Sequence, residues 1–381
     1  MSSRRSPVQV FAIDDTSLQL TWRGLRPGDL RITAADAVVT AEVVGPGPGV
    51  ATLTDLPPGT DLEVRATGSA LVEAAEILVR TDDRLPGEEL VRVATVSDLH
   101  LGAEVFGHLG TIREEPRPPV PHPVRCAGAA VDEAAAWGAR RILAKGDLTN
   151  HGRVPEWRHY ADLVRRSPVP VDAAPGNHDR AFRFGGTGLA PEDAARTFDL
   201  SMATPLLVRD EPGLRIVLAD TTTRHRNRGQ IAGVHHDIVA AAADAPAGSA
   251  VIVGLHHQIH REPTPEVYPV GIGQLEGRRF LAALGATGHP TLVTSGHTHR
   301  HRRWSHAGVT VTQVGSTKDY PGVWAGYVVH EGGMRQVVRR ITAPDCLAWT
   351  DHTRRAALGA WRWVAPGYLS SRCFSVRWDR P

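Results

Sequence analysis

Five short clusters of metal-binding residue types occur in the middle of the chain. They are DLH at 98–100, GDLTNHG at 146–152, GNHD at 176–179, HH at 256–257 and GHTH at 296–299. Carboxylate, imidazole and amide groups suit manganese, iron or zinc as ligands. Two such ions about 3.5–4 Å apart can deprotonate water and neutralise phosphate charge. Because hydrolysis of a phosphoester requires both effects, the clusters indicate metal-dependent chemistry of that kind.

The spacing inside two clusters places potential ligands side by side. Asp98 and His100 end the run VRVATVSDLH, and residues i and i+2 of an extended segment point the same way. His297 and His299 are related in the same manner within GHTH. Any one of the 19 histidines alone is more often a surface or core residue. The prediction therefore depends on the recurrence of the clusters.

The elements that must position the clusters are indicated by the apolar runs before them. Strands are predicted in VRVATV, RRILAK, PVPVDAA, RIVLAD, AVIVG and PTLVTS, and a helix in CAGAAVDEAAAWGA. Apolar strands that each end in a polar cluster fit an α/β sheet with its site beyond the strand ends. The Pro-rich stretch 101–124 is expected to be a functional or mobile loop.

Residues 7–80 show a different pattern. SLQLTW and TDLEVRAT alternate apolar and polar residues, and the turn sequences LRPGD, VGPGPG and LPPGT lie between such runs. This spacing predicts a small β-sandwich, and TLTDLPPGTDLEVRA resembles a corner of fibronectin type III domains. We expect a packing or dimerising module without catalytic residues.

The ordered clusters resemble the calcineurin-like metallophosphoesterases over about Val91 to Ile341. The first motif, which ends in His100, is similar to that of class III cyclic-nucleotide phosphodiesterases, and the residues after Asp147 lack the tyrosine of purple acid phosphatases. The resemblance implies an α/β fold, a four-layer αββα sandwich with a dinuclear metal centre at its strand ends. Here it would follow the small all-β sandwich.

The resemblance also implies a role for each matched residue. It gives three ligands to the first metal (Asp98, His100 and His299), three to the second (Asn177, His256 and His297) and one that bridges both (Asp147). His178 matches the catalytic histidine, and we expect Asp179 to orient it by accepting its other proton. The predicted substrate contacts are Asn150, Arg180 and His257.

The expected reaction is hydrolysis of a phosphoric ester, most of all a diester, with a metal-bridging hydroxide as nucleophile. A phosphomonoesterase and a nuclease are the alternatives within the enzyme class. A catalytically dead scaffold that acts as a binding protein is the alternative outside it. All eight family positions carry competent residues, which counts against the dead scaffold.

The composition indicates which kinds of binding partner to expect. The net charge of +2 and the lack of an aromatic and basic stripe count against nucleic acid. No apolar run approaches membrane-spanning length, the start lacks a signal-peptide pattern, and three scattered cysteines form no disulfide framework. We expect a cytoplasmic protein that binds a small-molecule phosphoester, and a homo-oligomer is left open. Lysine occurs only at Lys145 and Lys318, which we interpret as compositional bias.

Three parts are predicted along the chain. They are a β-sandwich at 1–85, a catalytic domain at 86–343 and an aromatic-rich tail at 344–381 that packs on the domains. A short helix is expected in HTRRAALGAWRWV. The alternative is a tail that closes over the site as a lid, with Arg354 or Arg372 near substrate.

Overall fold

Two six-stranded sheets form the centre of the molecule in the computed structural model, which describes residues 6–107, 110–180, 188–224, 226–263 and 269–378. The first sheet has the order β12-β11-β8-β19-β20-β21. Its strands are β12 (Val171–Ala174), β11 (Arg141–Lys145), β8 (Glu89–Val96), β19 (Val323–His330), β20 (Gly333–Arg340) and β21 (Phe374–Arg377). The first three run parallel, and the other three pair antiparallel.

The second sheet has the order β13-β14-β15-β16-β18-β17. Its strands are β13 (Leu206–Glu211), β14 (Leu214–Ala219), β15 (Ala250–Gly254), β16 (Thr291–Ser295), β18 (Val309–Gln313) and β17 (Arg302–His306). The four inner strands are parallel, and an antiparallel strand forms each edge. Every residue of the inner strands is buried, because both faces of such a sheet are covered.

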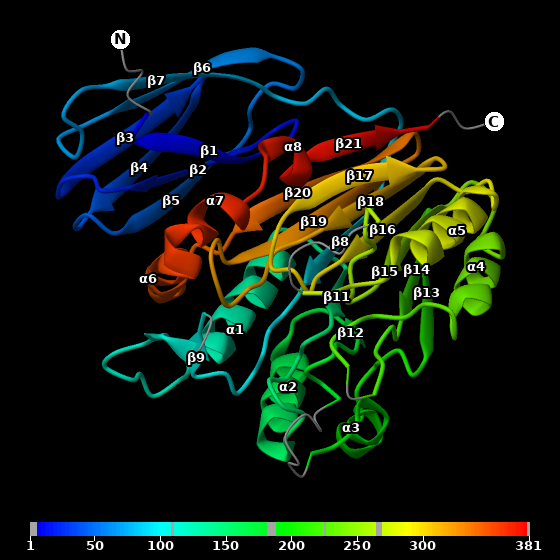
Figure 1. The fold of residues 1–381 in the computed structure, drawn as a ribbon. Coiled ribbons are helices and arrows are strands. Elements are labelled where there is room, and N and C mark those ends of the chain that lie inside the picture. Colours follow the sequence, from blue (N-terminus) through cyan, green and yellow to red (C-terminus); the bar gives the residue numbers. More distant parts are fainter. Residues whose placement is uncertain (1–5, 108–109, 181–187, 225, 264–268, 379–381) are drawn as a thin grey trace.

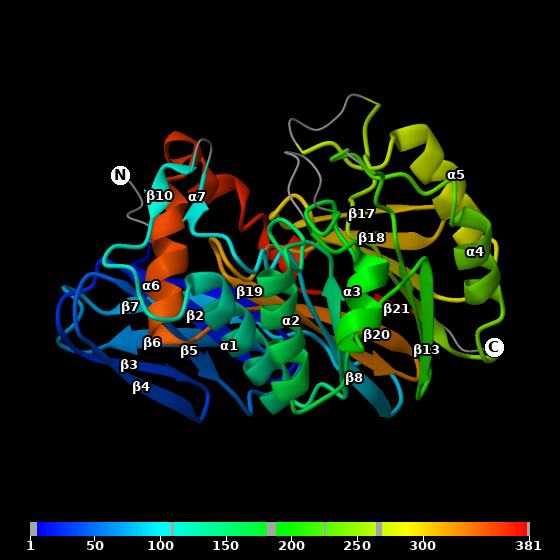
Figure 2. The same cartoon turned by 90° about the horizontal axis from the view of Figure 1, so that it is seen from below.

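Helices cover the outer face of each sheet, as Figures 1 and 2 show. Their bounds are α1 (His122–Ala136), α2 (Val154–Arg166), α3 (Pro191–Phe198), α4 (His235–Ala243), α5 (Gln274–Gly285) and α6 (Pro344–His352). Apolar residues of α1, α2, α3 and α6 pack with the first sheet, and those of α4 and α5 pack with the second. The predicted αββα sandwich is confirmed.

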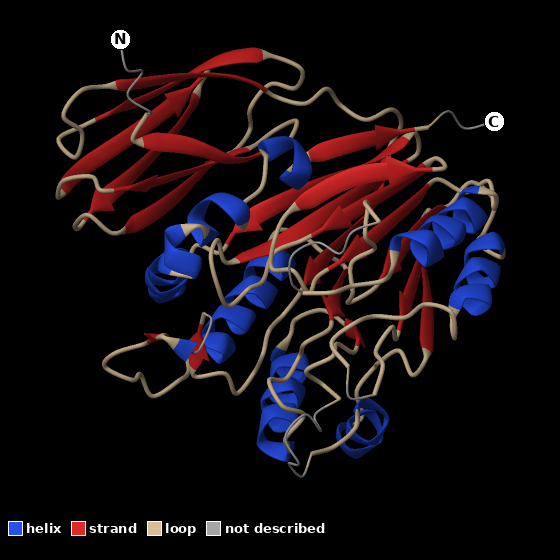
Figure 3. Ribbon diagram, in the orientation of Figure 1, coloured by secondary structure: helices blue, strands red, loops and turns tan. Residues whose placement is uncertain are grey.

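The N-terminal part is all-β and antiparallel, as predicted (Figure 3). One sheet has the order β1-β2-β5 and the other β4-β3-β6-β7. The bounds are β1 (Val8–Ile13), β2 (Leu18–Arg23), β3 (Gly28–Ala34), β4 (Ala37–Val43), β5 (Pro48–Leu53), β6 (Asp61–Thr67) and β7 (Ala75–Arg80). Its likeness to fibronectin type III domains and the three domain boundaries remain predictions.

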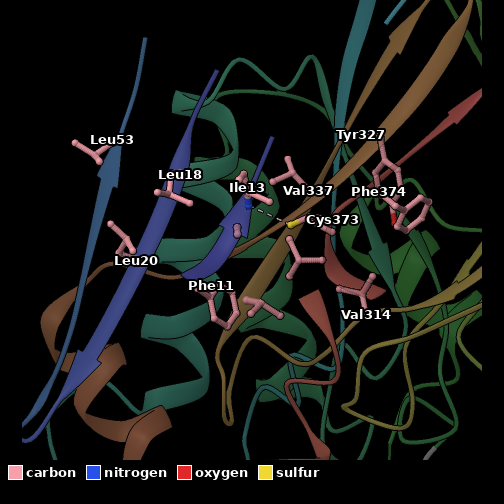
Figure 4. Packing of buried hydrophobic residues seen from close by; sticks show 14 of the residues in the cluster. Phe11, Ile13, Leu18, Leu20, Leu53, Val314, Tyr327, Val337, Cys373 and Phe374 are labelled. Atoms are coloured by element: carbon pink, nitrogen blue, oxygen red, sulfur yellow. Dashed lines mark hydrogen bonds between the residues drawn. The ribbon is translucent and has the colours of Figure 1, made fainter. Parts of the chain in front are cut away.

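One apolar cluster runs from this N-terminal part into the space between the two central sheets. Figure 4 shows Ile13 of β1, with Leu18 and Leu20 of β2 on one side and Val337 of β20 and Cys373 on the other. The Ile13 amide donates a hydrogen bond to Cys373 Sγ at 3.5 Å. The N-terminal strands therefore share a core with the end of the chain.

The C-terminal segment is part of the fold. Helix α6 packs against α1, and β21 extends the first sheet beside β20. Between them lie the 3₁₀ turns Thr353–Arg355 and Ala357–Gly359, α7 (Trp361–Val364) and α8 (Leu369–Arg372). The helix expected in this stretch is therefore interrupted, because Leu358 has a left-handed φ of 55°. Arg354 pairs with Asp351.

A short hairpin, β9 (Val105–Phe106) with β10 (Ile112–Arg113), lies in the Pro-rich loop after β8. Within the described residues, no helix combines the length and apolar character needed to cross a membrane.

Candidate metal centre

All seven predicted ligands follow the ends of strands, and five of them have a left-handed backbone conformation. Asp98 and His100 follow β8, Asp147 follows β11, and His297 and His299 follow β16. Their φ angles lie between 46° and 68°, a left-handed region that residues other than glycine seldom adopt. Hydrogen bonds between different loops hold this conformation, for example from the His297 amide to Asp98 Oδ1 at 3.0 Å. Strained backbone of this kind clusters at functional sites.

The three residues predicted for the first metal lie together. His299 Nε2 is 3.3 Å from Asp98 Oδ1 and 3.4 Å from His100 Nε2. One ligand atom from each of the three lies within 4.8 Å of the others. Asp98 and His100 are buried, so a cation between them is shielded from water.

The residues predicted for the second metal converge in the same way. His256 Nε2 is 3.2 Å from Asn177 Oδ1 and 3.1 Å from His297 Nδ1. Asp147 lies between the two groups, with Oδ1 3.3 Å from His256 Nε2 and Oδ2 3.4 Å from His100 Nε2. This placement is the one that a bridging carboxylate requires.

The hydrogen bonds made by Nδ1 of two histidines indicate whether the site can accept metal ions. His256 Nδ1 donates to the Lys145 carbonyl oxygen at 2.9 Å, and His299 Nδ1 donates to Asp319 Oδ1 at 2.5 Å. Each bond places the ring proton on Nδ1 and leaves the lone pair of Nε2 facing the site. The donor set therefore fits two metal ions.

The charge of the site supports the same conclusion. Burial opposes protonation of His256, but the Asp147 carboxylate outweighs it and raises the pKa to about 9. Burial also opposes protonation of His299, while Asp319 and Asp98 raise its pKa to about 10. The carboxylates thus favour positive charge in their midst, which metal ions would supply.

His178 lies beside this cluster. Its Nδ1 donates to the Asn150 carbonyl oxygen at 2.9 Å, and its amide donates to Asp147 Oδ1 at 2.9 Å. The ring is 4.6 Å from that of His100, and one ring nitrogen is within ligand reach of His100 and Asp147. The first bond directs Nε2 away from Asn150, and in the imidazolium form, with both ring nitrogens protonated, Nε2 can donate a proton.

The expected role of Asp179 is wrong. Its buried carboxylate accepts from the amides of Leu148, Thr149 and Gly176 at 2.7–3.1 Å. It also accepts from Thr149 Oγ1 at 2.8 Å. Asp179 therefore fixes the loops after β11 and β12, and the Asn150 carbonyl group orients His178 instead.

Two of the three predicted substrate contacts point elsewhere. The Arg180 guanidinium pairs with Glu192 at 2.7 Å and with Asp220. His257 is fully buried, and its Nδ1 is 2.8 Å from Thr221 Oγ1. Its ring packs against His256 and His297, and one of its ring nitrogens lies within ligand reach of theirs. Asn150 alone of the three lines the cavity at the site.

Two of the cluster glycines are needed for close packing. A Cβ at Gly176 would lie 2.2 Å from the Asp147 amide nitrogen, and one at Gly296 would lie 1.9 Å from Ser97 Oγ. Gly146 has a φ of 76°, a left-handed conformation that glycine adopts without steric cost.

A cavity of about 510 Å³ opens onto the ligands. Besides ligands, His178 and Asn150, its lining includes Phe106, Arg300, Lys318 and Trp361. Sequence reasoning missed Lys318 as a cavity residue and Asp319 as the partner of His299. The one available signal was that Lys318 is one of only two lysines in the chain.

Comparisons with known proteins agree with this geometry. The family model of the calcineurin-like phosphoesterases matches residues 91–301. A curated relative, a probable cyclic nucleotide phosphodiesterase of Rhodococcus erythropolis, is 25% identical over 189 residues. That alignment covers 48% of this chain and 59% of the relative, so this chain spans about three-fifths of the relative's length.

Similar solved structures include a purple acid phosphatase from yellow lupin, at 12% identity and a TM-score of 0.49, covering 97% of this chain and 74% of that one. Another is a dimetal phosphatase from Danio rerio, at 14% identity and a TM-score of 0.48. That match covers 66% of this chain and 97% of the phosphatase. The family model spans more than half of the chain and contains all five clusters. The chain therefore belongs to the calcineurin-like phosphoesterase family.

Proposed function

We propose that this protein is a metal-dependent phosphodiesterase with two metal ions in one site. The observation that carries the proposal is the position of Asp147, whose two carboxylate oxygens face His100 on one side and His256 on the other. Asp98 and His299 complete one group, and Asn177 and His297 complete the other. Manganese, iron and zinc all suit these ligands.

Metal ions bound here would neutralise phosphate charge and lower the pKa of water. The protein's own residues then have three tasks. Asp147 and the histidines would hold the cations in a buried site, where electrostatic attraction is strong. His178 is fixed through Nδ1 by the Asn150 carbonyl group, and as an imidazolium it would give its Nε2 proton to the departing alcohol and keep the proton on Nδ1. The strained strand ends keep the ligands in place before substrate arrives.

Two observations favour diesters over monoesters. The cavity of about 510 Å³ has room for groups on both sides of a phosphate. The curated relative is described as a probable cyclic nucleotide phosphodiesterase. We further propose that the substrate is a small molecule.

The test compares bis(p-nitrophenyl) phosphate with p-nitrophenyl phosphate on protein that has been stripped of metal and reloaded with Mn²⁺, Zn²⁺ or Fe²⁺. We expect kcat/KM for the diester to exceed that for the monoester at least roughly tenfold, a difference of about 1.4 kcal/mol in the barrier. Asp147→Asn is the inactive control. Higher activity on the monoester would indicate a phosphomonoesterase. Full metal occupancy without hydrolysis of either ester would indicate a non-catalytic scaffold.

A further inference from the structure

Two conspicuous residues of the cavity come from outside the matched family region. Lys318 follows β18, and Trp361 begins α7, whereas the family match ends at residue 301. The metal ligands all lie inside the match. Segments that follow the family region therefore contribute to the cavity beside residues such as Phe106, which lies inside that region.

Lys318 is a buried cation that lacks an acidic partner. It is 5% exposed, and its ammonium group lies 5.7 Å from the centre of the Phe106 ring. None of the ion pairs between described residues includes it. The acidic groups that act on it are Asp319, Asp98 and Asp147. Asp319 is bonded to His299 and Trp361, and the other two lie among the metal ligands.

The other lysine, Lys145, is also buried, but its ammonium group has hydrogen-bond acceptors. Lys145 Nζ donates to Thr294 Oγ1 at 2.8 Å and to the Ser295 carbonyl oxygen at 3.0 Å. A buried ammonium without such acceptors is costly, and contact with an aromatic ring offsets only part of that cost. Lys318 lines the cavity, so an anion that enters the cavity can supply the missing acceptor.

Two aromatic side chains, Phe106 and Trp361, line the cavity together with this cation. The Phe106 and Trp361 rings are 6.0 Å apart, and Phe106 stacks on His299 at 6.4 Å. Trp361 Nε1 donates to Asp319 Oδ2 at 3.1 Å, and the Arg300 guanidinium lies 5.6 Å from its ring. These contacts fix the rings, so they offer a planar group a stacking surface that costs little ordering entropy.

We infer that Lys318 binds a phosphate oxygen of the substrate, and that Trp361 with Phe106 binds a flat aromatic group on the alcohol of the ester. This inference rests on the proposed function, since it concerns the same site. It names the substrate class as aromatic phosphoesters. Two of these three residues, Lys318 and Trp361, follow the family region.

The experiment measures binding by calorimetry on the metal-loaded full chain, with phenylphosphonate and methylphosphonate as probes. Their C–P bond resists hydrolysis, so binding is measured apart from turnover. The two probes share one anionic group and differ in the ring. We expect the wild-type protein to bind phenylphosphonate roughly tenfold more tightly, the scale of one aromatic stack.

Four variants separate the contributions. Lys318→Met should lower the affinity for both probes roughly 10- to 100-fold, as loss of a hydrogen bond from a charged group does. Trp361→Leu should remove the preference for the ring, whereas Trp361→Phe should keep most of it while losing the bond to Asp319. Trp363→Leu is the matched control, because Trp363 is 60% exposed and is absent from the cavity lining. Metal content and melting temperature are measured for every variant.

Equal affinity of the two probes for the wild-type protein would overturn the inference without recourse to any variant. Unchanged phosphonate affinity in a folded, metal-loaded Lys318→Met protein would overturn the role of the lysine. If the probes bind as expected but no phosphoester is hydrolysed, the inference stands and only the proposed function fails. If phosphoesters are hydrolysed but phenylphosphonate binds no more tightly than methylphosphonate, the proposed function stands and only this inference fails.

Discussion

At the scale of single residues, the site depends on side chains held in a left-handed backbone. Asp98, His100, Asp147, His297 and His299 all adopt it, and each is fixed at the end of a strand. The bonds from His256 to the Lys145 carbonyl group and from His299 to Asp319 select the ring nitrogen that faces the metals. Ligand geometry here is therefore determined before any metal binds.

The bridging position of Asp147 gives the first prediction. Asp147→Ala should lose both metals and all activity, because its two oxygens serve both groups of ligands. Asp98→Ala should weaken mainly one metal, because Asp98 lies in the group with His299. Metal content by mass spectrometry of the purified variants is the measurement. Retention of both metals in Asp147→Ala would exclude the bridge.

His178 gives the second prediction. His178→Ala should keep both metals but lose roughly 100-fold or more in kcat, the usual scale for a positioned acid–base group. The structure also places a His178 ring nitrogen within ligand reach of Asp147, so metal content must be measured beside the rate. Loss of a metal in this variant would make the residue a ligand.

At the scale of elements, strand β21 ties the end of the chain to the first sheet. It pairs with β20, and Phe374 is 5% exposed in the core that the N-terminal strands share. The guanidinium of Arg372 donates to the Phe11 carbonyl oxygen at 3.0 Å. Neither Arg354 nor Arg372 lines the cavity, whereas Trp361 does. The C-terminal segment thus contributes an aromatic ring to the site, where the lid alternative expected an arginine.

The third prediction concerns this docking. Phe374→Ala should lower the free energy of unfolding by roughly 3–5 kcal/mol, the range for truncating a buried phenylalanine. Tyr368→Ala is the matched control, since Tyr368 is 80% exposed, and it should change stability by less than about 0.5 kcal/mol. Urea unfolding of both variants is the measurement. Equal stability of the two would show that β21 does not support the core.

At the scale of the whole molecule, buried arginines join the N-terminal strands to the first sheet. Arg335 of β20 is 2% exposed and pairs with Asp15 at 2.5 Å and with Asp82 at 3.4 Å. Arg339 pairs with Asp14 at 2.7 Å. The Gln19 side chain bonds to the backbone of Arg340 through both of its polar atoms. These contacts specify how the two parts sit together.

The fourth prediction tests this joint. Arg335→Met leaves Asp15 and Asp82 without their cation, and removing one partner of a buried pair costs roughly 3–5 kcal/mol. Because both carboxylates are partly exposed, we expect the lower end of that range. Arg65→Met is the control, since Arg65 and its partner Glu76 are both more than half exposed. A thermal midpoint of Arg335→Met equal to that of the control would contradict the prediction.

The sequence by itself determined the αββα fold and the positions where ligands would gather. The α/β class and the ligand positions depend on local pattern, because an apolar strand followed closely by Asp98 or His297 carries its ligand at the strand end wherever the strand packs. The four-layer arrangement was expected from the resemblance of the ordered clusters to the family. The breaks in the pattern were harder to predict. Leu358 interrupts the helix expected near the C-terminus through its backbone conformation, which no periodicity encodes.

Only the tertiary structure decided which neighbours of the clusters face the cavity. Arg180 turns to Glu192 and Asp220, and Asp179 turns to the loop amides, because those partners come from other parts of the chain. Lys318 and Trp361 reach the cavity from segments that follow the last cluster, after the two sheets have packed. A side chain's partner depends on distances across the fold, and the sequence around one residue does not contain them.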